Sequence, residues 1–197
     1  MLWRTLLTIA LLAHLPHFAE GQVKSVNTAV VVLPQGAVTR IPSPNRHWTL
    51  IFECPDYAKT RKLWIVDNGS HARKLVKDYE RNLAIAWAPD SQRFFVDDDY
   101  GSNGSGSYVI DPATLKITDL SVIIANNVAD ATPFFNAGHS YFRAKRWLNS
   151  HELLVVLFGH FDEPPPRSVP GSFTIKYQVD LNGSARKISQ RPIEQPQ

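Results

Sequence analysis

The most polar stretch of the chain, residues 97–105, contains three consecutive aspartates followed by tyrosine, glycine, serine and asparagine. Ca²⁺ binds carboxylate oxygens, so Asp97, Asp98 and Asp99 form a candidate calcium site. The EF-hand pattern of alternating aspartates, a glycine and a distal glutamate is absent from this stretch of sequence. On a strand, Asp97 and Asp99 would share one face and Asp98 would lie on the other. We therefore favour a solvated hairpin loop over a calcium site and expect no cofactor.

Two histidines stand in similar glycine-containing segments. Residues 138–141 read Gly-His-Ser-Tyr, and residues 159–163 read Gly-His-Phe-Asp-Glu. Strand ends of stacked sheets gather at one rim, so His139 and His160 could converge there. An exposed loop histidine is most often a solvated side chain, and we favour that interpretation over a functional pair.

Other catalytic motifs find little support. Residues 151–155 begin like the zinc-protease helix motif, but Val155 stands where the second histidine is required. A strand explains this run fully, so we reject a zinc site there. The sequence contains neither a Gly-x-Ser-x-Gly nucleophile elbow nor the lysine of a phosphate-binding loop in its Gly/Ser-rich run. A hydrolase or a nucleotide-binding enzyme is therefore not favoured.

Aromatic residues gather between residues 121 and 142, in a segment with no strand pattern to bury them. An exposed aromatic cluster marks a partner site, whereas the tryptophans within strand patterns are expected to fill the core. We therefore predict a binding surface that combines this segment with the loop at residues 161–166. Its candidate residues are Phe134, Phe135, His139, Tyr141, Phe142, His160, Phe161 and Asp162.

An internal repeat organises the elements that must position these residues. Three units each contain a polar turn, an apolar strand, a variable loop, a second strand that ends in aspartate, another turn and a short final strand. The closest match aligns residues 66–75 with residues 179–188. The turns carry Asn-Gly at 68–69 and 182–183 and Asp-Pro at 111–112, and these residue types suit tight turns. Antiparallel meander sheets are therefore predicted.

The stretch from Trp87 to Val96, Trp-Ala-Pro-Asp-Ser-Gln-Arg-Phe-Phe-Val, resembles the Trp-Ser-Pro-Asp-Gly-Lys signature of TolB-type, WD40-like β-propeller repeats. The same signature occurs in the propellers of prolyl oligopeptidase-like proteins. The resemblance covers residues 42–190 and implies an all-β fold: an incomplete or small propeller-like stack of three meander sheets. It says almost nothing about activity, because such blades serve binding scaffolds, assembly factors and enzyme lids alike.

The expected organisation follows from the repeat and its flanks. A leader precedes an N-terminal strand segment that is expected to join the first or the last sheet. A loop or short-helix insert separates the second and third units, and a frayed tail follows. The boundaries are 1–21 for the leader, 22–41 for the strand segment, 42–190 for the repeat domain with units at 42–80, 81–120 and 143–190, 121–142 for the insert, and 191–197 for the tail.

The N-terminus has the pattern of a signal peptide. Arg4 precedes an apolar run of about eleven residues, too short for the roughly 20 that span a membrane, and small residues favour cleavage before Gln22. No membrane span is expected after cleavage. Cys54 is the only cysteine, so no intramolecular disulfide can form. An exported chain without disulfides suits the periplasm or another part of a bacterial envelope.

Composition excludes some functions. The 197 residues are 44% hydrophobic, and a net charge of +3 is too small and too scattered for a nucleic-acid surface. We predict an exported, non-catalytic module that binds a protein or an envelope component. The alternative is a hydrolase-associated or calcium-dependent domain with a site on the rim loops. Three units fall short of the about four blades that close a propeller, so the chain must hide a fourth sheet, stay open or pair with another copy.

Overall fold

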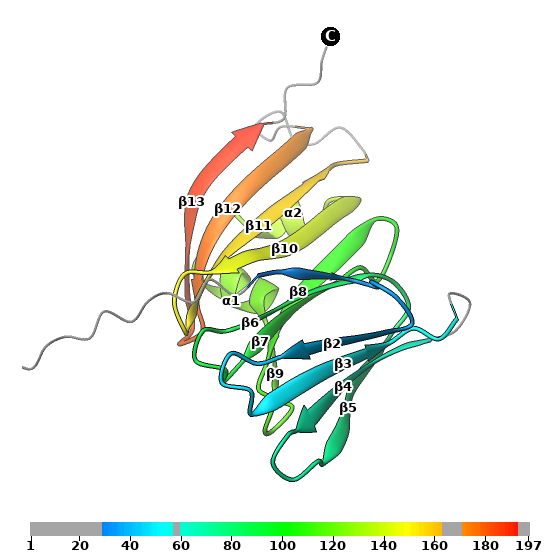
Figure 1. Cartoon of the computed structure of the whole chain (residues 1–197). Coiled ribbons are helices and arrows are strands. Elements are labelled where there is room, and N and C mark those ends of the chain that lie inside the picture. Colours follow the sequence, from blue (N-terminus) through cyan, green and yellow to red (C-terminus); the bar gives the residue numbers. More distant parts are fainter. Residues whose placement is uncertain (1–28, 57–59, 163–170, 193–197) are drawn as a thin grey trace, which may run out of the picture.

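The computed structural model describes residues 29–56, 60–162 and 171–192. The predicted leader and residues 193–197 of the predicted tail lie outside these ranges. The described chain forms three antiparallel meanders stacked on one another, and the second and third are joined along one edge (Figure 1). The prediction of an open, all-β, propeller-like stack of three sheets with a helical insert is confirmed. None of the described helices is long and apolar enough to cross a membrane.

Each sheet follows the order of the sequence. The first contains β2 (Val38–Pro42), β3 (Trp48–Glu53), β4 (Arg61–Asp67) and β5 (Arg73–Tyr79). The second contains β1 (Val31–Leu33), β6 (Leu83–Trp87), β7 (Phe94–Asp98), β8 (Gly104–Ile110) and β9 (Ile117–Asp119). The third contains β10 (His139–Trp147), β11 (Glu152–His160), β12 (Ser172–Asp180) and β13 (Ser184–Pro192).

Strand β1 departs from the expected arrangement. It pairs with β6, so it joins the middle sheet rather than the first or the last. The following strand, β2, lies in the first sheet. Leu33 at the end of β1 is fully buried among residues of both sheets. The N-terminal segment therefore ties two sheets together, because its apolar residue fills the space between them.

Two kinds of turn recur in every meander, and their hydrogen bonds explain why asparagine and aspartate occupy the same position of the repeat. In the turns after β2, β6 and β10, a side-chain oxygen accepts a hydrogen bond from the backbone N–H two residues later. The acceptors are Asn45, Asp90 and Asn149, with distances of 2.9, 3.0 and 2.9 Å. In the later turn the same bond is made by Asp67, Asp111 and Asp180 at 2.8, 2.9 and 2.8 Å. Asparagine and aspartate both build this turn, so the repeat tolerates their exchange.

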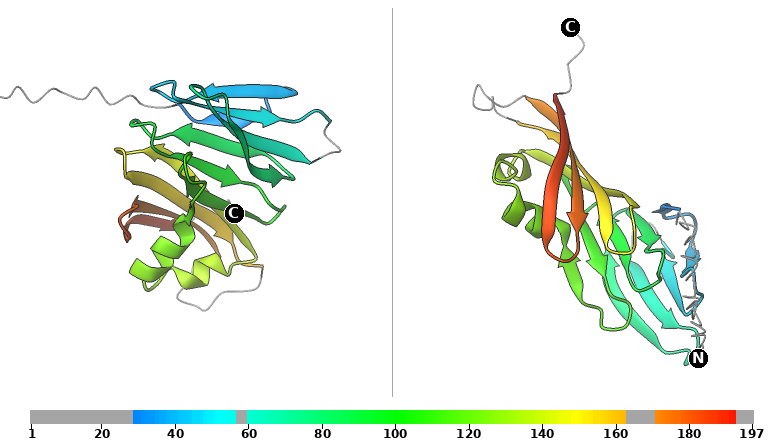
Figure 2. Two further views of the ribbon diagram at one scale, coloured as in Figure 1. Left: turned by 90° about the horizontal axis from the view of Figure 1, so that it is seen from below. Right: turned by 90° about the vertical axis from the view of Figure 1, so that its left-hand side faces the viewer.

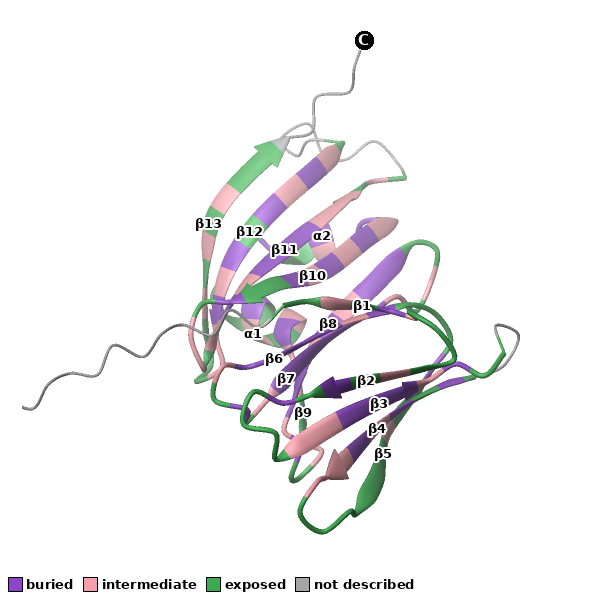
Figure 3. Cartoon of the chain, viewed as in Figure 1, coloured by how far each residue is buried: buried purple, intermediate pink, exposed green. Residues whose placement is uncertain are grey.

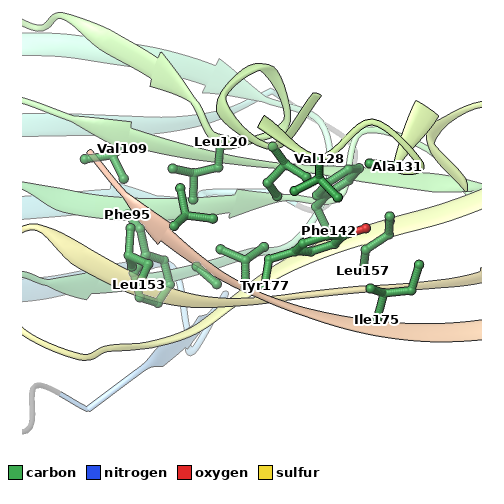
Figure 4. Close-up of a cluster of buried hydrophobic side chains, with 14 of the residues drawn as sticks. Phe95, Val109, Leu120, Val128, Ala131, Phe142, Leu153, Leu157, Ile175 and Tyr177 are labelled. Carbon is green, nitrogen blue, oxygen red and sulfur yellow. The ribbon is translucent and has the colours of Figure 1, made fainter. Parts of the chain in front are cut away.

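The middle sheet lies between two hydrophobic cores. Phe94 and Val96 on β7 belong to the core shared with the first sheet, whereas Phe95 belongs to the core shared with the third sheet. Side chains alternate between the two faces of a strand, so all five residues of β7 are buried. Figure 3 shows the contrast with β12, where buried and more exposed positions alternate. Figure 4 shows Phe95, Tyr177 and Leu153 in the core next to the third sheet.

The insert forms two short helices, α1 (Leu120–Asn127) and α2 (Thr132–Phe135). Helix α1 begins where the Asp119 side chain accepts a 2.8 Å hydrogen bond from the backbone N–H of Ser121. Both helices lie against one face of the third sheet (Figure 2). Leu120 and Ile124 are the buried residues of α1, so this insert closes a core.

The prediction that the aromatic residues of the insert form an exposed cluster is wrong. Phe134 is only 5% exposed, and its ring lies 4.9 Å from that of Phe173. Phe142 is buried on β10 and meets the ring of Phe135 at 5.0 Å. The sequence shows no strand pattern here, but Phe142 lies on β10 itself, and Phe134 and Phe135 pack against the face of the third sheet.

Candidate functional site

The ladder between β10 and β11 ends in a pair of histidines. His139 is the Cα partner of His160 at the last rung of the register. Their rings stack with centroids 4.1 Å apart and planes inclined by 15°. Directly opposite side chains on antiparallel strands lie within contact distance of one another. The two histidines thus lie together, an arrangement that the sequence allowed without favouring a functional pair, and antiparallel pairing is the cause.

Asp162 completes the cluster two residues after β11. Its Oδ1 lies 2.8 Å from Nδ1 of His139 and 3.7 Å from Nε2 of His160. Gly138 makes room for this carboxylate, since a Cβ at that position would lie 1.8 Å from Oδ2 of Asp162. A side chain at position 138 would therefore displace the Asp162 carboxylate from its place beside His139. The Gly-His pairs at 138–139 and 159–160 are visible in the sequence, but only the pairing register of β10 and β11 shows that the two histidines lie opposite one another.

Contacts next to the cluster hold its backbone. The N–H of Phe161 donates a 2.9 Å hydrogen bond to the carbonyl of Gly171. The ring of Phe161 lies 5.6 Å from that of Phe173 and 6.1 Å from that of Phe134. Phe161 is partly buried against the core. This predicted site residue therefore fixes the chain next to Asp162 and leaves the carboxylate in solvent.

Tyr141 lies beside the cluster on the same strand as His139. Their rings are 6.4 Å apart, and the Tyr141 hydroxyl donates a 2.7 Å hydrogen bond to the carbonyl of Ser102. The Tyr141 ring also stacks on that of Phe158, with the ring centroids 5.3 Å apart. Of the eight predicted binding residues, the structure thus gathers His139, Tyr141, His160 and Asp162 at the surface. It places Phe134 and Phe142 in the core, with Phe135 and Phe161 packed against it.

The three aspartates at the end of β7 do not come together. Asp97 accepts hydrogen bonds from the Ser107 hydroxyl at 2.6 Å and from the Ala144 N–H at 2.9 Å. Asp98, which points to the other face, forms an ion pair with Lys77 at 3.1 Å. Asp97 and Asp98 are buried, so the interpretation of these two residues as part of a solvated loop is wrong. Within the described ranges, His139, His160 and Asp162 are the only group of three or more His, Cys, Asp or Glu side chains that could hold a metal ion.

Asp99 faces a polar cleft that the sequence did not indicate. Its carboxylate lies 2.5 Å from the guanidinium of Arg143 on β10. The cleft has a volume of about 410 Å³, and Arg61 and Arg81 also line it. Arg61 donates to the carbonyl of Glu80. The residues that line the cleft lie on or next to strands of all three sheets and form no recognisable motif in the sequence. Only the folded structure brings them together.

The sequence matches no protein-family model and no curated protein. Among solved structures, the β-propeller domain of the Trilobed protease from Pyrococcus furiosus is similar, with 11% identity, a TM-score of 0.49, and coverage of 78% of this chain and 43% of that one. Acylaminoacyl peptidase from Pyrococcus horikoshii has 15% identity, a TM-score of 0.46, and coverage of 79% and 24%. TolB from Acinetobacter baumannii has 12% identity, a TM-score of 0.40, and coverage of 81% and 32%. The chain thus spans less than half the length of each of these structures.

Proposed function

We propose that this chain is a non-catalytic, propeller-like scaffold that binds another protein along the open edges of its sheets. The site of action is the bacterial envelope, the compartment that the signal-peptide pattern of residues 1–21 predicts. The proposed surface replaces the aromatic insert as the candidate for partner binding, since the insert packs into the core.

One observation carries the proposal. Five strands, β1, β2, β5, β9 and β13, pair on one side only among the described residues. Each of them carries one large aliphatic side chain that is between 39 and 60% exposed, whereas the strands paired on both sides carry none within the described chain. These side chains are Val32, Val38, Leu75, Ile117 and Ile188.

Unpaired strand edges offer backbone N–H and C=O groups to an added strand. An exposed aliphatic beside such an edge adds apolar contact to the backbone hydrogen bonds, which is how proteins recognise a partner by strand addition. Edge position and exposed aliphatic residue therefore point to the same kind of ligand, an extended segment of another protein.

Charge narrows the choice of partner. The edge strand β5 carries Arg73 and Lys74, and the edge strand β13 carries Arg186 and Lys187 at the corresponding places of the repeat. Like charges placed opposite one another destabilise a strand pair, so these edges disfavour pairing with a second copy. We infer that the partner presents an extended segment with acidic side chains.

Photo-crosslinking tests this function. A crosslinking amino acid replaces Leu75 or Ile188 in the native host, and Val122, an exposed aliphatic on α1, is the matched control. We expect adducts with a second protein at the two edge positions, and mass spectrometry then maps the crosslinked peptide to an acidic segment. Equal yields at Val122, or adducts only with a second copy of the chain, would overturn the proposal.

A further inference from the structure

We propose that His139, His160 and Asp162 form a binding site for a divalent transition-metal ion of the zinc class. The site is independent of the proposed strand-edge binding, because it lies at the rung where β10 begins and β11 ends and uses none of the edge residues. Two of its ligands come from neighbouring strand ends, and the third, Asp162, lies two residues after the end of β11.

The spacing of the donor atoms supports a metal ion. One ligand atom from each residue lies within 4.8 Å of the other two. A tetrahedral ion with metal–nitrogen bonds of about 2.0–2.1 Å holds its ligand atoms about 3.4 Å apart. The closest pair, His139 Nδ1 and Asp162 Oδ1, is already within that distance at 2.8 Å. To surround one ion, this pair must open slightly and the more distant donor atoms, which lie up to 4.8 Å apart, must approach, and we expect side-chain rotations to do both.

The kinds of donor define the class of metal. Two imidazole nitrogens and one carboxylate oxygen suit zinc, nickel, copper or cobalt. Calcium requires six to eight oxygen ligands, and this cluster contributes a single carboxylate. A hydrogen bond explains the contact between His139 and Asp162, and the register of β10 and β11 places His160 beside them, with its Nε2 3.7 Å from the same oxygen. A single ion at this place would bind all three donors at once.

The surroundings are built for this arrangement and leave it accessible. Gly138 clears the space that the Asp162 carboxylate fills, and the Phe161 backbone is tied to Gly171. The side chains of His139, His160 and Asp162 are 33, 50 and 56% exposed. Three protein ligands leave a fourth position for water or for a side chain of a bound partner.

Metal titration of the untagged, full-length protein tests the proposal. Calorimetry with ZnCl₂ should show one ion per chain, and Co²⁺ should give the visible absorption bands of a tetrahedral site. The variant H160A should bind Zn²⁺ at least tenfold more weakly and lose the cobalt bands. His151 is an exposed histidine at the opposite end of β11, so H151A is the matched control and should bind as the wild type does.

Two results would overturn the site. One is the absence of saturable Zn²⁺ binding by the wild type, and the other is equal affinity in H160A and H151A. The variant D162N gives a second test that leaves both histidines in place, and it should also weaken binding at least tenfold. Unchanged binding in D162N would exclude the three-ligand arrangement. Thermal melts of each variant without metal show whether the folded state is retained.

Discussion

At the scale of single residues, Asp97 has a buried carboxyl group whose pKa lies well above the usual value for aspartate. It is 2% exposed on β7 and faces the third sheet. Burial raises the pKa of Asp97 to about 7, even though hydrogen bonds from Ser107 and Ala144 and the charge of Arg143 oppose the rise. Since the usual value for aspartate is near 3.8, the folded protein holds a proton that the unfolded chain has already lost between about pH 4 and pH 7.

This difference predicts how stability depends on pH. The folded state binds more protons than the unfolded state in this range, so the free energy of unfolding falls as the pH rises, by roughly 1.4 kcal/mol per pH unit for this group. The variant D97N cannot titrate. We expect urea titrations to show that the wild type loses about 2 kcal/mol more than D97N between pH 5 and pH 7. Parallel pH profiles for the two proteins would mean that Asp97 is ionised in the folded state.

At the scale of elements, the insert links packing to the candidate metal site. Phe134 on α2 contacts Phe173 of β12 and Phe161 next to Asp162. The same aromatic contact that attaches the helix to the third sheet therefore also supports the backbone of the site. Removal of the Phe134 ring should therefore first reduce the packing of the core.

The variant F134A should lower the free energy of unfolding by about 3 kcal/mol, because the removal of a buried aromatic ring leaves a cavity. Val122 on α1 is exposed, so V122A serves as the control and should change stability by less than about 0.5 kcal/mol. Chemical denaturation of both variants provides the measurement. A fully stable F134A protein would instead restore the interpretation of the insert as a free aromatic surface.

The sequence predicted these elements where local chemistry decides the structure. The recurring aspartates at 67, 111 and 180 accept turn hydrogen bonds, so the three meanders could be found from the repeat alone. The sequence allows the convergence of His139 and His160 but does not predict it, because residues 121–142 show no strand pattern of their own whereas His139 is the first residue of β10. The covering of Phe134, the pairing of β1 with β6 and the arginine-lined cleft depend on contacts between distant segments. No local pattern encodes those contacts.

At the scale of the whole molecule, we expect the middle sheet to make the stack unfold as one cooperative unit. Neighbouring residues of β7 enter different cores: Phe94 packs toward the first sheet and Phe95 toward the third. The first and third sheets therefore depend on the same strand, although each has its own core. Loss of packing on one face of β7 should therefore also destabilise the sheet that packs against its other face.

The variant F95A tests this coupling. Phe95 is fully buried and its ring lies 6.2 Å from that of Trp147, so its removal should cost about 3 kcal/mol. If the stack unfolds as one unit, the most protected amides of β3 and of β11 should both exchange about 100-fold faster, since the slowest amides exchange through global unfolding. Native-state hydrogen exchange measures the two strands in one experiment. Faster exchange in β11 with unchanged exchange in β3 would show that the sheets open separately, because a disturbance confined to one core would then stop at β7.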